Sequence, residues 1–363
     1  TAAVCLLALV LAAHAIAAPL DLDALLGRPT VSNLVAAQDA PRIAWVQSAR
    51  GARSLWTAAG PDFRPVRLFE SGADDGQPLG SLRLTPDGST LVWVRGSAPN
   101  SAGEIANPAS DPAGVERAIW AVSTSGGEAW RIAEGGGPAL TPDGLAVLFA
   151  AAGGVFEASL RRPTSEAGAE PIAPERLFSV RGGAGALTVS PDGGRVAFVS
   201  DRGDHAFVGV FHREPARIVW MAPSVDRDGS PAWSHDGTKL AFLRAPGRRI
   251  GEHFDLTAAH PFSIWVADPG DGRARRLWVS PAEAGGFAQF YPPVSLAWTA
   301  GDRLIFTSEH GGWHHAFRLD PDSGEVADLT PGPFEIEAFT LSRDRAEVLF
   351  CGNHDDVERR YVW

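Results

Sequence analysis

Leu187-Thr-Val-Ser-Pro-Asp-Gly-Gly-Arg-Val-Ala-Phe-Val-Ser200 carries two short apolar segments on either side of a Ser-Pro-Asp-Gly turn. Pro presets one turn dihedral and Gly tolerates a positive φ, so this phrase predicts two strands joined by a tight hairpin. The phrase recurs along the chain, with weaker copies near both ends, at turns centred on Asp39, Asp87, Asp143, Asp192, Asp236, Gly301 and Asp344. The chain therefore contains seven starts of one repeat.

The spacing of the turns is typical of one architecture. Successive turns lie 43 to 65 residues apart, and a propeller blade occupies roughly 40–50 residues. The two longest intervals need insertions, for which Gly96–Glu116 and Pro246–Pro261 are the candidates because they are rich in loop-forming residues. The sequence predicts an all-β fold, a β-propeller of four-stranded blades with seven repeats, the last of them incomplete.

The fifth repeat shows the expected strands best. They are predicted over Ser230–Ser234, Lys239–Arg244, Ser263–Ala267 and Arg275–Val279. One such blade cannot bury both of its faces, whereas a ring of blades can. Four tryptophans recur at or near the third strands of their repeats and are expected to pack between blades: Trp56, Trp120, Trp265 and Trp363.

The composition excludes some function classes. The 363 residues carry a formal net charge of −11, and 45% of them are hydrophobic. An acidic chain without a basic stripe does not favour a nucleic-acid partner.

The first residues are typical of a secretory signal. Val4–Ala13 is apolar but too short to span a bilayer, and Ala15-Ile-Ala-Ala18 provides small residues for cleavage. We expect residues 1–18 to be a signal peptide that is truncated at its start, and residues 19–363 to be the propeller. This predicts a periplasmic or secreted protein with no membrane anchor after cleavage. Cys351 is then the only cysteine and is expected to be buried in a strand.

No catalytic constellation is found in the sequence. It contains no G-x-S-x-G nucleophile elbow, no phosphate-binding Walker loop and no paired-cysteine metal motif. Glu309-His-Gly-Gly-Trp-His-His315 fits no metal spacing and is read as a polar loop within a blade. We therefore predict no catalytic residue, no cofactor and no metal ion in this chain.

Two charged loops remain as site candidates. One follows the second strand of the fourth repeat and the other precedes the first strand of the fifth, so both should emerge on the same rim of the ring. They form either a local network of ion pairs or a surface for a substrate or a second domain. The candidate residues are Asp201, Arg202, Asp204, His205, Asp226, Arg227 and Asp228.

These same residues carry a family resemblance. Leu187–His205 and Ala222–Trp233 resemble the propeller of prolyl oligopeptidase family serine peptidases, and most of all the dipeptidyl-peptidase IV-like branch. Asn107–Ser110 with Glu116–Val122 resembles the second-blade insertion of that branch, and Asp355–Trp363 resembles a late-blade strand. The resemblance extends from about Asp21 to Trp363. The Pro-Asp-Gly repeat alone is shared with WD40-like and TolB-like propellers.

The resemblance implies a function for the chain. In that family the propeller precedes a C-terminal α/β-hydrolase domain with a Ser-Asp-His triad, and it narrows the access of peptides to the serine. The chain would then be the non-catalytic propeller, and its partners would be peptide substrates and the hydrolase domain that is absent here. The paired glutamates of the dipeptidyl-peptidase branch are not identifiable, so dipeptidyl, acylaminoacyl and prolyl endopeptidase activities all stay open. The alternative is a TolB-like periplasmic scaffold that binds proteins.

Overall fold

A computed structural model describes residues 27–71, 74–100, 102–112, 114–162, 173–247, 260–282 and 295–363. These residues form strands joined by turns and loops, and none of them lies in an α-helix. The described ranges accordingly hold no helix of the length and apolarity needed to cross a bilayer. The predicted signal peptide and most of the insertion predicted at Pro246–Pro261 lie outside them.

The strands group into seven blades in chain order. Blade 1 holds β1 (Thr30–Ala36), β2 (Arg42–Ala49), β3 (Ala52–Ala59) and β4 (Val66–Glu70). Blade 2 holds β5 (Leu79–Leu84), β6 (Thr90–Arg95), β7 (Ala118–Ser123) and β8 (Trp130–Glu134). Blade 3 holds β9 (Gly136–Leu140), β10 (Ala146–Ala151), β11 (Gly154–Ser159) and β12 (Glu175–Ser179). Blade 4 holds β13 (Gly185–Val189), β14 (Arg195–Asp201), β15 (Ala206–His212) and β16 (Arg217–Trp220).

The remaining strands complete the series. Blade 5 holds β17 (Arg227–Trp233), β18 (Leu240–Ala245), β19 (Ser263–Ala267) and β20 (Ala274–Val279). Blade 6 holds β21 (Leu296–Trp298), β22 (Leu304–Ser308), β23 (His315–Leu319) and β24 (Val326–Asp328). Blade 7 holds β25 (Ile336–Leu341), β26 (Val348–Gly352) and β27 (Tyr361–Val362).

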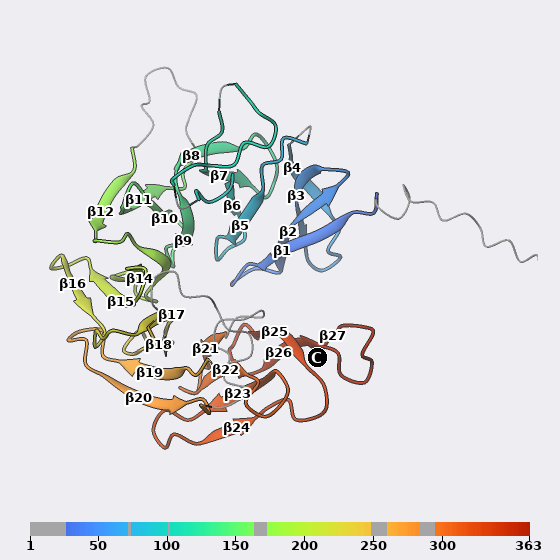
Figure 1. Cartoon of the computed structure of the whole chain (residues 1–363). Coiled ribbons are helices and arrows are strands. Elements are labelled where there is room, and N and C mark those ends of the chain that lie inside the picture. The colour runs from blue at the N-terminus through green and yellow to red at the C-terminus, as the bar shows by residue number, and fades with distance from the viewer. Residues whose placement is uncertain are drawn as a thin grey trace, which may run out of the picture.

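Each blade is an antiparallel sheet whose strands pair in sequence order. Blades 4 and 5 are also joined by one parallel pairing, of Ala206 in β15 with Arg227 in β17. The blades follow one another around an arc, with blade 1 in blue and blade 7 in red at its two ends (Figure 1). The first strands of blades 1 to 6 contact one another in series. The predicted all-β propeller is therefore confirmed.

In blades 2, 3, 4, 5 and 7 the recurring turn closes its hairpin with the same side-chain hydrogen bond, from a Ser or Thr hydroxyl to the turn aspartate. In blade 4 the Ser190 hydroxyl donates to Asp192 Oδ1 at 2.5 Å and accepts from the backbone N–H of Arg195 at 2.9 Å. Asp192 Oδ1 in turn accepts from the N–H of Gly194 at 3.0 Å. Gly193 follows with φ +73°, a conformation that glycine adopts with little cost. These bonds explain why Ser or Thr, Asp and Gly recur at fixed spacing.

The hydrophobic core lies between the blades. Six buried clusters are present, and each combines side chains from two successive blades, from blades 1 and 2 through to blades 6 and 7. Leu148 and Phe178 of blade 3, for example, pack on Val196 and Phe198 of blade 4. Burial of apolar area contributes about 25 cal/mol per Å², so contact between neighbouring blades is what stabilises each of them.

The prediction that the third-strand tryptophans pack between blades is confirmed for two of them: Trp120 packs against the cluster between blades 1 and 2, and Trp265 against the cluster between blades 4 and 5. Stacking within a blade accompanies this packing. Trp56, Trp120 and Trp265 stack on Trp45, Trp93 and Phe242, their partners on the second strand of the same blade. Residues directly opposite one another in an antiparallel pair have neighbouring Cβ atoms, so these rings meet within a blade. Trp363 exchanges both backbone hydrogen bonds with Phe350 of β26, which is the same relationship in blade 7.

Two other expectations need correction. The sequence predicts that Arg227 and Asp228 lie in a loop, but β17 begins at Arg227 because these two residues pair with Ala245 and Arg244 of β18. Cys351 lies in β26, as expected, but is half-buried rather than buried, since among the described residues blade 7 shares a buried cluster with blade 6 only.

Candidate functional site

The two charged loops meet on one rim of the ring, at the junction of blades 4 and 5. Arg227 Nη2 pairs with Asp201 Oδ2 at 2.7 Å, and Arg227 Nη1 donates to the carbonyl oxygen of Gly203 at 2.5 Å. The N–H of Ala206 donates to the carbonyl oxygen of Asp226 at 3.1 Å. One arginine thus fastens the turn after β14 to the start of β17.

The turn between β14 and β15 presents the remaining charges of this rim. His205 Nδ1 lies 2.6 Å from Asp204 Oδ1, and this hydrogen bond holds the pKa of Asp204 below its usual value. The guanidinium of Arg202 lies over the ring of Phe207 and donates to the Ser200 hydroxyl at 3.2 Å. The carboxylates of Asp201 and Asp204 are more than half exposed. This surface can receive cationic or hydrogen-bonding groups from a partner.

Asp226 and Asp228 contribute differently. Asp226 accepts a hydrogen bond from the Ser224 hydroxyl at 3.3 Å within the loop itself. Asp228 is fully buried and pairs with Arg244, whose Nε donates to it at 2.6 Å. Burial raises the pKa of Asp228, although the hydrogen bond from Arg244 opposes that shift. Asp228 therefore lies beneath the rim and supports it, and it does not reach solvent.

The central channel opens on the opposite face, where the turns between first and second strands lie. A cavity of about 590 Å³ is lined there by residues from all seven blades. Its charged wall residues include Arg83, Arg345 and Asp39, and its aromatic wall is formed by Trp233 and Trp298. Burial of the Arg83 guanidinium lowers its pKa. Its volume lies within the range of about 300–1,000 Å³ that sites for small molecules occupy.

Tryptophans and an arginine hold the channel wall together across blade boundaries. Trp233 Nε1 donates to the Thr188 carbonyl at 3.1 Å, and Trp298 Nε1 donates to the Ala232 carbonyl at 3.0 Å. Arg345 Nη1 donates to the Trp298 carbonyl at 2.9 Å. These hydrogen bonds join the inner strands of successive blades at the mouth of the channel.

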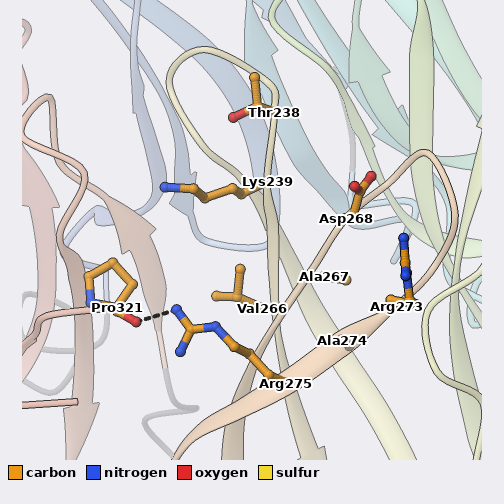
Figure 2. Close-up of a pocket in the computed structure, with 9 residues that line it drawn as sticks. All are labelled: Thr238, Lys239, Val266, Ala267, Asp268, Arg273, Ala274, Arg275 and Pro321. Carbon is orange, nitrogen blue, oxygen red and sulfur yellow. Dashed lines mark hydrogen bonds between the residues drawn. The ribbon is translucent and has the colours of Figure 1, made fainter. Parts of the chain in front are cut away.

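A smaller hollow of about 430 Å³ lies between blades 5 and 6 (Figure 2). Its three cations already have partners: Arg275 donates to the Pro321 carbonyl at 2.5 Å, Lys239 pairs with Asp302 at 2.8 Å, and Arg273 pairs with Asp271. The cationic side chains of this hollow are therefore already engaged by nearby residues of the same protein, which disfavours their binding a ligand.

The histidines that follow β22 and the one that begins β23 belong to the fold. His315 Nδ1 contacts Asp328 Oδ2 at 2.9 Å, and His314 Nδ1 contacts the Ile336 carbonyl at 2.7 Å. His310 contacts the Ser308 hydroxyl at 2.9 Å, but Ser308 is only 2% exposed and no substrate can reach it. No group of three or more metal-binding side chains occurs within the described ranges.

Sequence reasoning missed the channel residues. Arg83 interrupts the apolar run Leu82-Arg-Leu84 of an inner strand, and that interruption is the signal that could have identified it. Arg345 occupies the position of the turn glycine in blade 7, with φ +56°, and it carried no comparable signal.

Comparison with solved structures agrees with the propeller. The chain is similar to one described in a study of two prolyl endopeptidases, with a TM-score of 0.61 and 14% identity, over 93% of this chain and 50% of that one. A puromycin-hydrolyzing peptidase of Mycobacterium tuberculosis gives a TM-score of 0.58 and 18% identity, over 94% and 52%. The tricorn protease gives 0.54 and 12%, over 92% and 36%.

These similarities confirm, at the level of the fold, the resemblance to peptidase propellers. The chain spans about half the length of the first two proteins and about a third of the third. No protein-family model and no curated protein matches the sequence.

Proposed function

We propose that this chain is the β-propeller of a secreted serine peptidase and selects the peptides that reach an α/β-hydrolase domain. The observation that carries the proposal is the match of over nine-tenths of the chain to proteins described as peptidases, each of which is about twice as long or longer. The signal-like residues 4–18 support a periplasmic or secreted location.

The channel mouth supports selection by size. A cavity of about 590 Å³ bounded by seven blades admits an extended chain segment and excludes a folded domain. Arg83, Arg345 and Asp39 on its wall supply charges of both signs that favour some peptides over others.

The rim at blades 4 and 5 supports contact with a second domain. Asp201 and Asp204 are exposed, whereas Arg227 holds their loop in place. A loop that is already fixed in place loses little conformational freedom on docking.

The test compares this chain with the natural reading frame that contains it. Both proteins are assayed on dipeptidyl, acylaminoacyl and prolyl chromogenic peptides, with and without a serine-directed inhibitor. The expected result is inhibitor-sensitive turnover by the longer protein and none by residues 19–363 alone. Inhibitor-sensitive turnover by the chain alone contradicts the proposal, and a reading frame without a hydrolase domain favours a protein-binding scaffold instead.

A further inference from the structure

Arg117 lies on the wall of a separate cavity of about 430 Å³ between blades 2 and 3. It directly precedes β7, and its carbonyl oxygen accepts a hydrogen bond from the N–H of Gly135 at 2.9 Å. The opposite wall is built from small residues at Ala150–Gly154 and from Gly183 and Ala184. Ile105 adds an apolar side and Glu134 adds a single carboxylate.

The guanidinium of Arg117 rests on the backbone of Gly136, the first residue of β9. A Cβ atom at position 136 would lie 2.3 Å from Arg117 Cζ and 2.5 Å from Nη2. The backbone of Gly136 is outside the positive-φ region, so its own conformation does not require glycine. The guanidinium therefore occupies the space that a side chain at position 136 would fill, and such a side chain would displace it.

The charge of Arg117 is unmatched. Within the described ranges its side chain forms no ion pair or hydrogen bond, and its Nε is buried without an acceptor. The neighbouring arginines differ, since Arg95 pairs with Asp75 at 2.6 Å and Arg131 pairs with Glu116 at 2.8 Å. A partly buried cation without a partner is costly, so an anion bound in the cavity would be stabilised.

We propose that this cavity binds the C-terminal carboxylate of a short peptide. A planar guanidinium and a carboxylate form two parallel charge-assisted hydrogen bonds, and the small-residue wall leaves room for a peptide backbone. Glu134 disfavours anions with more than one charge. Only the choice of a peptide as the bearer of the carboxylate rests on the proposed function.

The position of the cavity agrees with this role. Gly183 and Ala184 follow Gly182, where an added Cβ atom would lie 2.3 Å from the carbonyl oxygen of Asp201. The cavity therefore reaches the same rim as the charged loops of blades 4 and 5.

The test measures binding to this chain by isothermal titration calorimetry. The probes are N-acetyl-Ala-Ala with a free carboxylate, the same peptide as its amide, and inorganic phosphate. We expect the acid to bind about tenfold or more tightly than either other probe, the ratio expected from one bidentate pair. Equal affinity for acid and amide overturns the carboxylate site, and tighter binding of phosphate overturns the peptide.

Two variants and a control locate the site. Arg117→Gln should remove the preference for the acid, and Gly136→Ala should weaken it about as much by displacing the guanidinium while keeping its charge. Arg131→Gln, which alters an arginine outside the cavity, should leave it unchanged. Retention of the preference in both Arg117→Gln and Gly136→Ala, with thermal melts showing folded protein, overturns the proposal. Because no hydrolysis is measured, the absence of a hydrolase domain would not affect this result.

Discussion

Asp228 and Arg244 form an ion pair at 2.6 Å in which both side chains are at least nine-tenths buried. The second Nη of Arg244 also donates to the Ala222 carbonyl at 2.7 Å, so the pair ties the loop entering blade 5 to β18. The guanidinium lies over the ring of Trp265, 4.5 Å from its centroid. The charged rim is thus supported from below by a second, buried charge pair.

Removing one partner of this pair should destabilise the protein strongly. Asp228→Asn leaves the Arg244 charge buried and uncompensated, which typically costs about 3–5 kcal/mol. Urea unfolding of the variant and of the wild type measures the difference. Asp204→Asn, at an exposed position, is the matched control and should leave the free energy of unfolding nearly unchanged. Equal losses in the free energy of unfolding in the two variants would contradict a stabilising role for the buried pair.

The phenyl ring of Phe198 packs directly over Gly209, where it leaves no room for a side chain. A Cβ atom on Gly209 would lie 2.5 Å from Phe198 Cζ, and Phe198 also contacts Phe178 and Trp220. The ring has no room to retreat, so Gly209→Ala should cost about 1–3 kcal/mol through overpacking. Gly80→Ala is the control, because nothing lies within 4 Å of the added carbon there. Thermal melts that fail to separate the two variants would contradict this packing.

The repeat made much of the fold predictable. Each Ser/Thr-Pro-Asp-Gly turn forms its own hydrogen bonds, so it marks a hairpin whatever surrounds it. The second strand expected over Lys239–Arg244 is observed as Leu240–Ala245. The weak copy in blade 6 also forms a tight turn, because Asp302 adopts a positive φ of +58° at the position that glycine occupies in the strong copies.

The site was less predictable, because it depends on pairs of residues far apart in sequence. The burial of Asp228 follows from the register that places Arg244 opposite it. The surroundings of Arg117 depend on how blade 3 packs against blade 2. Nothing in the sequence around Gly136 predicts that the arginine lies against it. Local patterns identified charged loops but not which charges reach solvent.

The turn glycines allow a graded comparison. Gly193 and Gly237 have φ near +73° and +71°, and a side chain in this conformation costs about 1–2 kcal/mol. At Gly193 an added Cβ atom would meet only Pro142, at 3.9 Å, whereas at Gly237 it would lie 3.2 Å from Arg195 Nη2. We expect Gly237→Ala to cost more than Gly193→Ala, and Val to cost more than Ala at both positions. Unchanged melting temperatures in all four variants would refute the left-handed turn.

The exposed rim gives a functional prediction that rests on the longer protein. Asp204→Ala removes an acceptor from the surface proposed to face the hydrolase domain, and its carboxylate is more than half exposed. We expect kcat/KM for peptides to fall about twofold to tenfold, as is typical when one exposed contact is removed, with the melting temperature unchanged. Equal kinetics in the variant and the wild type would assign the rim to local structure alone.

The turn aspartates predict how stability depends on pH. Asp236 accepts hydrogen bonds from the Ser234 hydroxyl at 2.7 Å and from the Thr238 N–H at 2.9 Å, and these lower its pKa from 3.8 to about 2. A folded pKa below the unfolded value contributes stability above about pH 4, and that contribution is lost as the pH falls towards 2. Asp236→Asn cannot titrate, so the gap in melting temperature between wild type and variant should be full near pH 6 and should narrow steadily below pH 4. Other turn aspartates titrate in both proteins and cancel in the difference. A gap that stays constant down to about pH 2 would show that the charge of Asp236 does not stabilise the turn.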